Sequence, residues 1–160
     1  MPDHLPNHLQ GDTVFDHSPD PDRPGWLKWG LREKDRYNST IGPMWAKLRQ
    51  DGITVVRTEP GHLQGNIGNN VHGGAMLTQI DIAFFVAARL HGALQYGPGV
   101  TLDLNTQFLA AGRIGEPLDA EVEILRETGR LLFLRGLLVQ GTDHIGAFSG
   151  TIRKTPKPRA

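Results

Sequence analysis

One continuous apolar segment constrains the fold more than any other feature of this 160-residue chain. Between about Gly74 and His91, apolar side chains fall at positions all round a helical wheel. A helix of this kind must be buried on more than one side, so a sheet that curls around it is needed to cover it. The helix is predicted to end at Gly92 and at the Gly-Pro-Gly sequence of residues 97–99.

The segments on either side of this helix show the two-residue alternation that is typical of half-buried strands. Before the helix, Met44–Arg49 and Ile53–Thr58 flank an Asp-Gly turn and predict a hairpin. After the helix, four further strands are predicted, at Thr101–Leu109, Leu118–Ile124, Leu131–Gln140 and Ile145–Arg153. The predicted fold class is therefore α+β, with an antiparallel sheet wrapped around one long central helix. The open edges of such a sheet favour association with a second copy of the chain.

The two ends of the chain differ in composition from the middle. Residues 1–25 contain five prolines and few apolar side chains, so we predict a flexible or loosely docked arm there. Trp26–Tyr37 mixes aromatic and charged residues and is predicted to form a short helix or a cap on the core. The resulting division is a partly flexible N-terminal arm over residues 1–40, one folded domain over 41–153 and a disordered tail over 154–160.

The composition excludes several classes of function. No cysteine is present, which excludes disulfides, thiol nucleophiles and cysteine-ligated metal sites. The seven histidines do not fall at metal-ligand spacings, so no metal site is predicted. Seventeen basic residues balance seventeen acidic ones, and no overall charge favours nucleic acid or a membrane as a partner. The N-terminal sequence has no basic and apolar regions of a signal peptide, so a cytoplasmic protein is expected.

A single carboxylate, Asp81, lies within the apolar helix and is the first candidate for a functional residue. Removing a carboxylate from water costs free energy unless a partner compensates, so such a residue is seldom retained without a use. Arg89 lies eight positions further on, about 12 Å along the helix axis, which is too far for an ion pair within the helix. A purely structural role, as a cap or at the rim of the core, is the alternative.

The sequence His72-Gly73-Gly74 stands where the same helix begins. The first backbone N–H groups of a helix have no partner within it, and a glycine lets a substrate carbonyl approach them closely. Such groups can act as an oxyanion hole, although paired glycines also simply allow a tight turn into a helix. Gly73 and Asp81 lie eight residues apart, about 12 Å along the axis, so they can act on one carbonyl only if two subunits share the site.

Together these features resemble the hotdog-fold acyl-CoA thioesterases of the phenylacetate-pathway (PaaI-like) family. The residues that carry the resemblance are Asn66, the His72-Gly73-Gly74 sequence, Asp81, residues 99–105 (GVTLDLN) and residues 112–116 (GRIGE). The resemblance covers residues 40–153 and the order of the strands and the helix. It implies a hotdog fold, a homodimer or a dimer of dimers, and active sites at the subunit interface.

The resemblance also implies a role for each matching residue. Asp81 would be the general base or nucleophile that acts on the thioester carbonyl. The backbone N–H of Gly73 and the side-chain amide of Asn66, both from the other subunit, would polarise that carbonyl. His72 would orient the loop or contact the substrate, and Thr101 would position the attacking water.

Two further expectations concern the substrate. Some hotdog thioesterases have a threonine one helical turn after the acid, where this chain has Phe85, and this difference increases the importance of Thr101. The phosphates of coenzyme A need basic partners, and Arg113 and Arg130 are candidates because both stand beside glycines in predicted turns. The alternative for each arginine is that it is an ordinary solvent-exposed turn residue with no role in binding. Gly74 is expected to contact the substrate at the start of the helix.

The predicted function is hydrolysis of an acyl-CoA thioester to free coenzyme A and a carboxylic acid, without a cofactor. One alternative is a hotdog dehydratase or hydratase, which needs a histidine and an acid together over one β-carbon. The other is a non-enzymatic acyl-CoA sensor, which would carry an attached DNA-binding unit that residues 1–40 do not resemble. Retention of Asp81 argues against pure binding, because a buried acid opposes the binding of an apolar acyl group.

Overall fold

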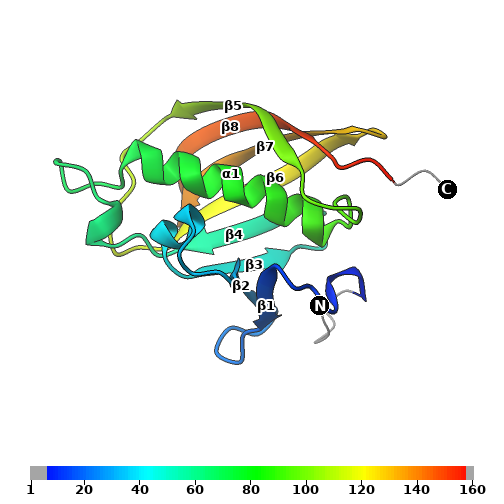
Figure 1. The fold of residues 1–160 in the computed structure, drawn as a ribbon. Helices are drawn as coiled ribbons and strands as arrows, with labels where there is room; N and C mark the ends of the chain where they lie inside the picture. Colours follow the sequence, from blue (N-terminus) through cyan, green and yellow to red (C-terminus); the bar gives the residue numbers. More distant parts are fainter. Residues whose placement is uncertain (1–6, 158–160) are drawn as a thin grey trace.

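One antiparallel sheet of eight strands carries a long helix on one of its faces in the computed structural model, which describes residues 7–157 (Figure 1). The strands are β1 (Phe15–Pro19), β2 (Leu27–Leu31), β3 (Met44–Leu48), β4 (Thr54–Thr58), β5 (Val100–Phe108), β6 (Leu118–Glu127), β7 (Leu131–Gln140) and β8 (Asp143–Arg153). The helical segments are α1 (Gly73–Leu90) and the 3-10 helices η1 (Asn7–Leu9), η2 (Tyr37–Ile41) and η3 (His62–Gln64). The strand order is β1-β2-β3-β4-β6-β7-β8-β5, which makes β1 and β5 the edge strands and confirms the predicted α+β architecture.

Helix α1 packs over the middle of the sheet and contacts β4 and β6 most extensively. Ile80, Ala83 and Phe84 are fully buried and supply the apolar side that the sequence pattern predicts. Phe84 packs edge-on against Phe148, with ring centroids 5.6 Å apart, and also lies over Gly150. A Cβ at Gly150 would lie 2.5 Å from the Phe84 ring, so this close approach of helix and strand requires a glycine.

One side of α1 remains open in the single chain. Leu77, Asp81 and Phe85 recur at one-turn spacing along this side, none of them is fully buried, and Leu77 is 38% exposed. Within the single chain the sheet covers the other sides of the helix and leaves this stripe open, so burial all round stays a prediction that requires a second chain. By length and mean hydropathy alone α1 resembles a short membrane span, but more than half of it is buried within this chain, as in a core helix.

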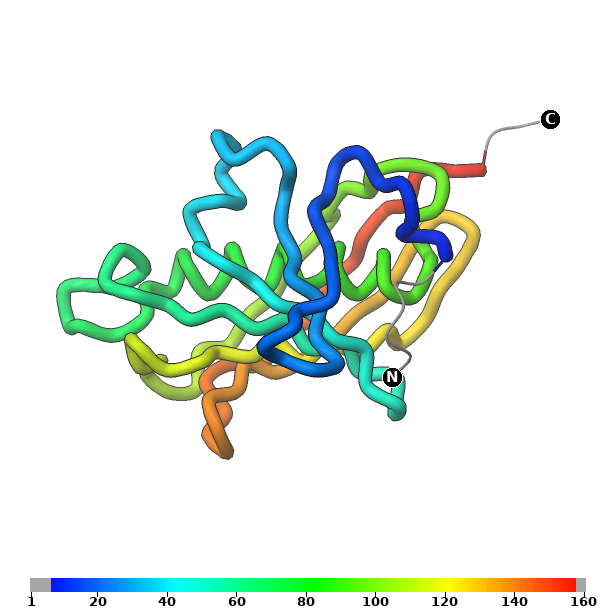
Figure 2. The backbone as a smooth tube through the Cα atoms, turned by 90° about the horizontal axis from the view of Figure 1, so that it is seen from below, coloured from blue at the N-terminus to red at the C-terminus, as the bar shows by residue number. Residues whose placement is uncertain are grey.

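The N-terminal part of the chain adds two strands to the sheet. The short helix or cap predicted over Trp26–Tyr37 is wrong for Leu27–Leu31, because this segment is β2 and pairs with β3. Trp29 in β2 is 5% exposed and belongs to the core. In Figure 2 the segment before β1 and the connection between β2 and β3 rise from the sheet on the side where α1 lies, and η2 in that connection contacts α1.

Asp12 ties the N-terminal segment to α1. Its carboxylate accepts hydrogen bonds from the backbone N–H groups of Val14 (2.8 Å) and Phe15 (3.0 Å) and forms an ion pair with Arg89 at 2.7 Å. Burial alone would raise the pKa of Asp12, but these two N–H donors and the charge of Arg89 hold it below its ordinary value. The prediction of a loosely docked arm is therefore wrong for the described part of the segment, and residues 1–6 lie outside the described residues.

The residues after β8, where a disordered tail is predicted, make two contacts with the domain. Lys154 forms an ion pair with Glu127, and the Thr155 hydroxyl donates a hydrogen bond to the carbonyl oxygen of Pro98. Residues 158–160 lie outside the described residues.

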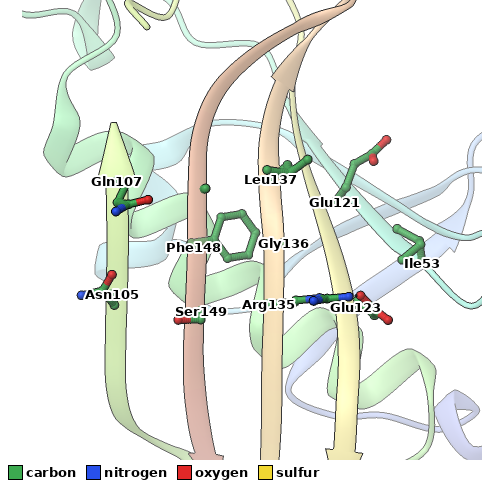
Figure 3. Close-up of a pocket in the computed structure, with 11 residues that line it drawn as sticks. Ile53, Asn105, Gln107, Glu121, Glu123, Arg135, Gly136, Leu137, Phe148 and Ser149 are labelled. Atoms are coloured by element: carbon green, nitrogen blue, oxygen red, sulfur yellow. The ribbon is translucent and has the colours of Figure 1, made fainter. Parts of the chain in front are cut away.

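The face of the sheet opposite α1 carries both polar and apolar side chains. An open cavity of about 560 Å³ runs across β5, β8, β7 and β6 on this face (Figure 3). Its polar side chains include Asn105, Gln107, Ser149 and an ion pair between Arg135 and Glu123. None of the residues predicted for the site lines this cavity.

Candidate active site

The Asp81 carboxylate and the Thr101 hydroxyl meet between helix α1 and edge strand β5. Thr101 Oγ1 donates a hydrogen bond to Asp81 Oδ1 over 2.6 Å, and both residues are half-buried. The pairing of β5 with β8 shifts register between Thr101 and Asp103, which marks a β-bulge. Such a bulge changes which side chains face the helix, so it accounts for the direction of Thr101. We call Asp81 and Thr101 the acid half-site.

The start of α1 is organised by His72. Its imidazole Nδ1 accepts a hydrogen bond from the Gly74 N–H at 2.8 Å and so caps the helix, which leaves Nε2 to carry the proton of the neutral ring. Gly73 is the first helical residue, and its N–H donates to no acceptor within residues 7–157. Of the two glycine N–H groups predicted at the substrate, that of Gly73 is open and that of Gly74 is occupied.

Asn66 lies in the tight loop before this helix start. Its Oδ1 accepts hydrogen bonds from the N–H groups of Gly68 (2.8 Å) and Asn70 (3.1 Å), and Asn69 between them adopts a left-handed conformation with φ of 58°. The two bonds to Oδ1 fix the orientation of the side-chain amide. Its Nδ2 donates to no acceptor in the part of the chain that the structure describes. We call Asn66, His72 and Gly73 the donor half-site.

The two half-sites lie at opposite ends of β5. Thr101 is near the beginning of the strand, whereas Phe108 at its end lies beside Gly73, such that a Cβ at Gly73 would be 3.3 Å from the Phe108 ring. Along α1, Gly73 and Asp81 are eight residues, about 12 Å, apart. One chain therefore holds both halves of the predicted site but does not bring them together.

The two arginines proposed for coenzyme A differ in their surroundings. Arg113 forms ion pairs of 2.8 Å with Glu116 and with Asp143, and hydrogen bonding to these carboxylates raises its pKa. Arg130, in the turn between β6 and β7, is exposed and forms no ion pair within residues 7–157. The donors of Arg113 are thus already engaged, whereas those of Arg130 remain open to a ligand.

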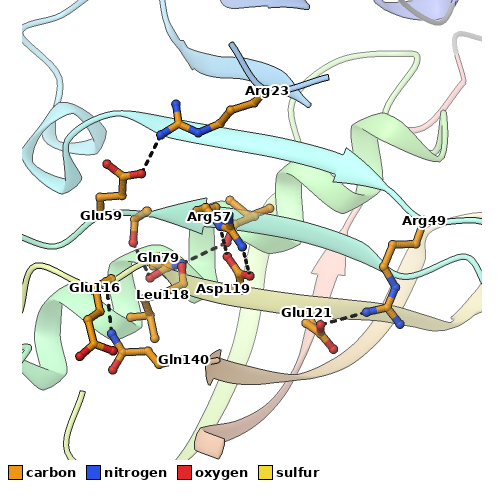
Figure 4. Close-up of polar contacts among 12 residues, drawn as sticks. Arg23, Arg49, Arg57, Glu59, Gln79, Glu116, Leu118, Asp119, Glu121 and Gln140 are labelled. Atoms are coloured by element: carbon orange, nitrogen blue, oxygen red, sulfur yellow. Dashed lines mark hydrogen bonds and ion pairs between the residues drawn. The ribbon is translucent and has the colours of Figure 1, made fainter. Parts of the chain in front are cut away.

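A buried glutamine, which the sequence interpretation left without a role, fixes α1 on the sheet. Gln79 is 1% exposed, and its Nε2 donates to the carbonyl oxygens of Val56 (3.1 Å) and Leu118 (2.8 Å) (Figure 4). Its Oε1 accepts a hydrogen bond from the Thr58 hydroxyl at 3.0 Å. Gln79 therefore binds β4 and β6 and sets the rotation of the helix that presents Asp81. The sequence contains one indication of this role, because Gln79 is a polar residue in a mostly apolar helix, two residues before Asp81.

A second buried glutamine holds the loop that carries Arg113. Gln140 Nε2 donates to the carbonyl oxygen of Glu116 at 3.2 Å (Figure 4). It also donates to the carbonyl oxygen of Arg113 at 2.9 Å, and Gln140 Oε1 accepts from the Arg113 N–H at 2.7 Å. This loop in turn forms a β-bridge to Asn70. Gln140 thus supports the donor half-site from the end of β7.

Comparison with known proteins assigns the chain to a family. The family model described as the thioesterase superfamily matches residues 68–147, which is half of the chain and includes most of both half-sites. No curated protein matched the sequence.

Solved structures show the same fold at low sequence identity. A hypothetical thioesterase from Streptococcus pneumoniae TIGR4, solved with coenzyme A, is 24% identical, with 71% of this chain and 88% of that chain covered and a TM-score of 0.62. Zebra fish thioesterase superfamily member 2 is 20% identical, with 76% and 88% covered and a TM-score of 0.64. The PaaI protein of the E. coli phenylacetic acid degradation operon is 20% identical, with 64% and 72% covered and a TM-score of 0.57. The chain therefore has the predicted hotdog fold and belongs to the thioesterase superfamily.

Proposed function

We propose that this protein hydrolyses acyl-CoA thioesters to free coenzyme A and a carboxylic acid. The observation that carries the proposal is the hydrogen bond between Thr101 and Asp81. It holds a carboxylate in one orientation at a half-exposed position on a helix that is otherwise mostly apolar, in a member of the thioesterase superfamily. The Streptococcus pneumoniae structure that contains coenzyme A supports the same type of substrate.

The chemistry requires only groups that this chain carries. The hydrogen bond to Asp81 Oδ1 leaves Oδ2 to accept a proton from water as the water oxygen attacks the thioester carbonyl carbon. The Gly73 N–H and the Asn66 Nδ2 would stabilise the negative charge that develops on the carbonyl oxygen. The carbon–sulfur bond then breaks, and the departing thiolate takes up the proton from Asp81. No metal or cofactor enters this sequence of steps.

We further propose that two chains pair through β5 to assemble each site. Within residues 7–157, β5 pairs only with β8, and its other edge is open. Exposed apolar residues gather along and beside this edge, namely Val100, Leu102, Phe108 and Leu109. Such an edge favours antiparallel pairing with a second copy of itself.

Antiparallel pairing about a two-fold axis at the middle of β5, near Leu104, is a register that would place Thr101 of one strand beside the end of the partner strand, where Phe108 lies. Because Phe108 contacts Gly73 in each chain, this register would bring the partner's donor half-site to the acid half-site. It would also cover the open stripe of α1 at Leu77 and Phe85. The same assembly thus accounts for the exposed apolar residues and for the separation of the half-sites.

Hydrolysis of a panel of aryl, phenylacetyl, short-chain and long-chain acyl-CoA thioesters tests the function. Released thiol is followed with a thiol-reactive dye, and the protein adds no background because it has no cysteine. We expect turnover of at least one class and its loss in an Asp81→Asn variant that remains folded. Saturable binding of the whole panel without turnover would contradict the proposed hydrolysis and would support an acyl-CoA sensor instead.

A further inference from the structure

A cavity lies between helix α1 and the N-terminal part of the chain. It has a volume of about 390 Å³, which is within the range of small-molecule sites. It forms where β2 ends and the connection from β2 to β3 rises from the sheet on the side of α1 (Figure 2). All but one of its residues precede the region that the family model matches, and neither half-site contributes to it. The cavity therefore belongs to a part of the molecule for which the proposed hydrolysis gives no role.

One wall of the cavity is apolar and built from four elements. Trp29 of β2, Met44 of β3 and Ile82 of α1 are between 5% and 6% exposed and belong to the core. Phe15 of β1 is half-buried and packs against the same core. Because these side chains are held by core packing, the wall is formed without a ligand and offers apolar surface to one.

Three polar side chains of the lining are free to bind a ligand. The side chains of Lys34, Asn38 and Ser39 take part in no hydrogen bond or ion pair within residues 7–157. The Lys34 ammonium lies beside Gly30, 3.6 Å from the position that a Cβ would have there, and Gly30 is also part of the lining. Asp16 shares an adjoining cleft with Lys34 but forms no ion pair with it. The charge of Lys34 is thus available to an anion.

A buried donor in the apolar wall also lacks an acceptor. The indole Nε1–H of Trp29 has no hydrogen-bond partner within residues 7–157, and such unpaired buried groups are rare in native structures. Lys34, Asn38 and Ser39 can donate as well, and none of the described residues that line the cavity is acidic. A set of donors without a carboxylate fits a ligand that carries acceptor oxygens, and a carboxylate also pairs with the lysine charge.

We propose that this cavity is a second small-molecule site, which binds an apolar carboxylate. The carboxylate group lies toward Lys34 and Ser39, and the apolar part of the ligand packs against Trp29, Met44 and Ile82. Burial of the apolar part supplies affinity, and the charged contact fixes the orientation of the ligand. The site lies within one chain and does not depend on the proposed hydrolysis.

Calorimetry on the full chain tests the site with 4-phenylbutyrate as the probe and 4-phenylbutanamide as the neutral ligand of the same shape. Lys34→Gln removes the charge, and Ser39→Phe fills the cavity from a position whose hydroxyl has no partner within residues 7–157. Lys157→Gln is the matched control, because Lys157 is an exposed lysine outside the lining and without an ion pair in the described part of the chain. Circular dichroism and elution volume check the fold of each variant.

We expect saturable binding of 4-phenylbutyrate by the wild type with a dissociation constant of about 1 mM or lower. The amide should bind about tenfold more weakly, and Lys34→Gln should weaken the binding of the acid to the same extent, as for one lost charged contact. Ser39→Phe should weaken binding about 30-fold or more, because its ring takes the space of the ligand. Added salt should weaken the binding of the acid and leave that of the amide unchanged.

Three results would overturn the inference: no saturable binding of 4-phenylbutyrate up to about 10 mM, equal affinity for the acid and the amide, or binding that neither variant changes. The last result would assign the acid to another site on the protein. If Ser39→Phe does not fold, Lys34→Gln and the amide decide the question. Asp81→Asn should bind 4-phenylbutyrate as the wild type does, which separates this site from the site proposed for hydrolysis.

Discussion

The acid half-site and the donor half-site are built by different means. Asp81 and Thr101 belong to a regular helix and a strand, are half-buried, and meet only because tertiary packing brings α1 and β5 together. Asn66 and His72 are exposed, and their orientation is fixed by hydrogen bonds to N–H groups within four residues of each. Each half-site is therefore organised within one chain, and only the approach of the two half-sites to one another depends on a second chain.

The largest effect is expected at the acid half-site. Asp81→Asn keeps the size of the side chain and its ability to accept the Thr101 hydrogen bond but cannot accept a proton from water. We expect kcat to fall about 1,000-fold, in the range of a lost general base. The measurement is steady-state hydrolysis of the best acyl-CoA, with circular dichroism and elution volume as controls for the fold. A loss of less than tenfold would contradict a role of Asp81 as general base and would indicate a structural role.

The next effect tests the donor half-site at one backbone N–H. Gly73→Pro removes this donor at the first helical position, where proline is well tolerated, and His72 already has the extended backbone (φ −64°, ψ 136°) that a following proline requires. We expect kcat to fall about 100-fold, as for other lost oxyanion donors. Gly73→Ala is the matched control, because it adds a Cβ near Phe108 and keeps the N–H. Equal losses in both variants would indicate a steric effect instead.

A smaller effect is expected from the hydroxyl that orients the acid. Thr101→Val keeps the shape of the side chain and removes the hydrogen bond to Asp81. We expect kcat to fall about tenfold, which corresponds to one hydrogen bond to a charged group. Thr101→Ser should recover most of the activity, and a serine variant as poor as the valine variant would show that the methyl group, not the hydroxyl, matters.

The N-terminal segment belongs to neither half-site and should affect stability alone. Asp12→Asn removes the charge that pairs with Arg89, and we expect the free energy of unfolding at pH 7 to fall by about 1–2 kcal/mol with kcat unchanged. The pKa of Asp12 lies below its ordinary value of 3.8, so its contribution is present at neutral pH and is lost as the pH falls below that value. Urea titrations at pH 7 and pH 3 should therefore show a difference between wild type and variant that shrinks at the lower pH. If the difference in unfolding free energy were the same at both pH values, the stabilisation would not come from the charge of Asp12.

The helix and strands with a strong hydrophobic periodicity could be predicted from the sequence, and so could the candidate site residues that lie within or beside them. The apolar run of α1 and the alternation of β3 to β8 give the fold, and the positions of Asp81 and of the glycines follow from the same pattern. The strand Leu27–Leu31 was missed because its aromatic and charged residues show no clear period and its pairing with β3 is a long-range contact.

The contacts within the site were less accessible to sequence reasoning. The hydrogen bond from Thr101 to Asp81 depends on the β-bulge near Leu102. The position of this bulge could not be predicted from the spacing of residues in the strand. Gln79 could be recognised as unusual in its helix, but its partners on β4 and β6 lie 21 to 39 residues away. The opposite surroundings of Arg113 and Arg130 likewise depend on which carboxylates the fold brings near each of them.

The most direct test of a site shared between subunits is complementation between two inactive variants. Asp81→Asn and Gly73→Pro chains are mixed in equal amounts, unfolded and refolded together, and assayed on an acyl-CoA. In a mixed dimer one site combines both defects and the other site has neither, so the preparation should recover about one quarter of the wild-type activity per chain. Activity no higher than that of the two separate variants, in a preparation shown to contain mixed dimers, would contradict a site built from the acid of one chain and the donors of the other.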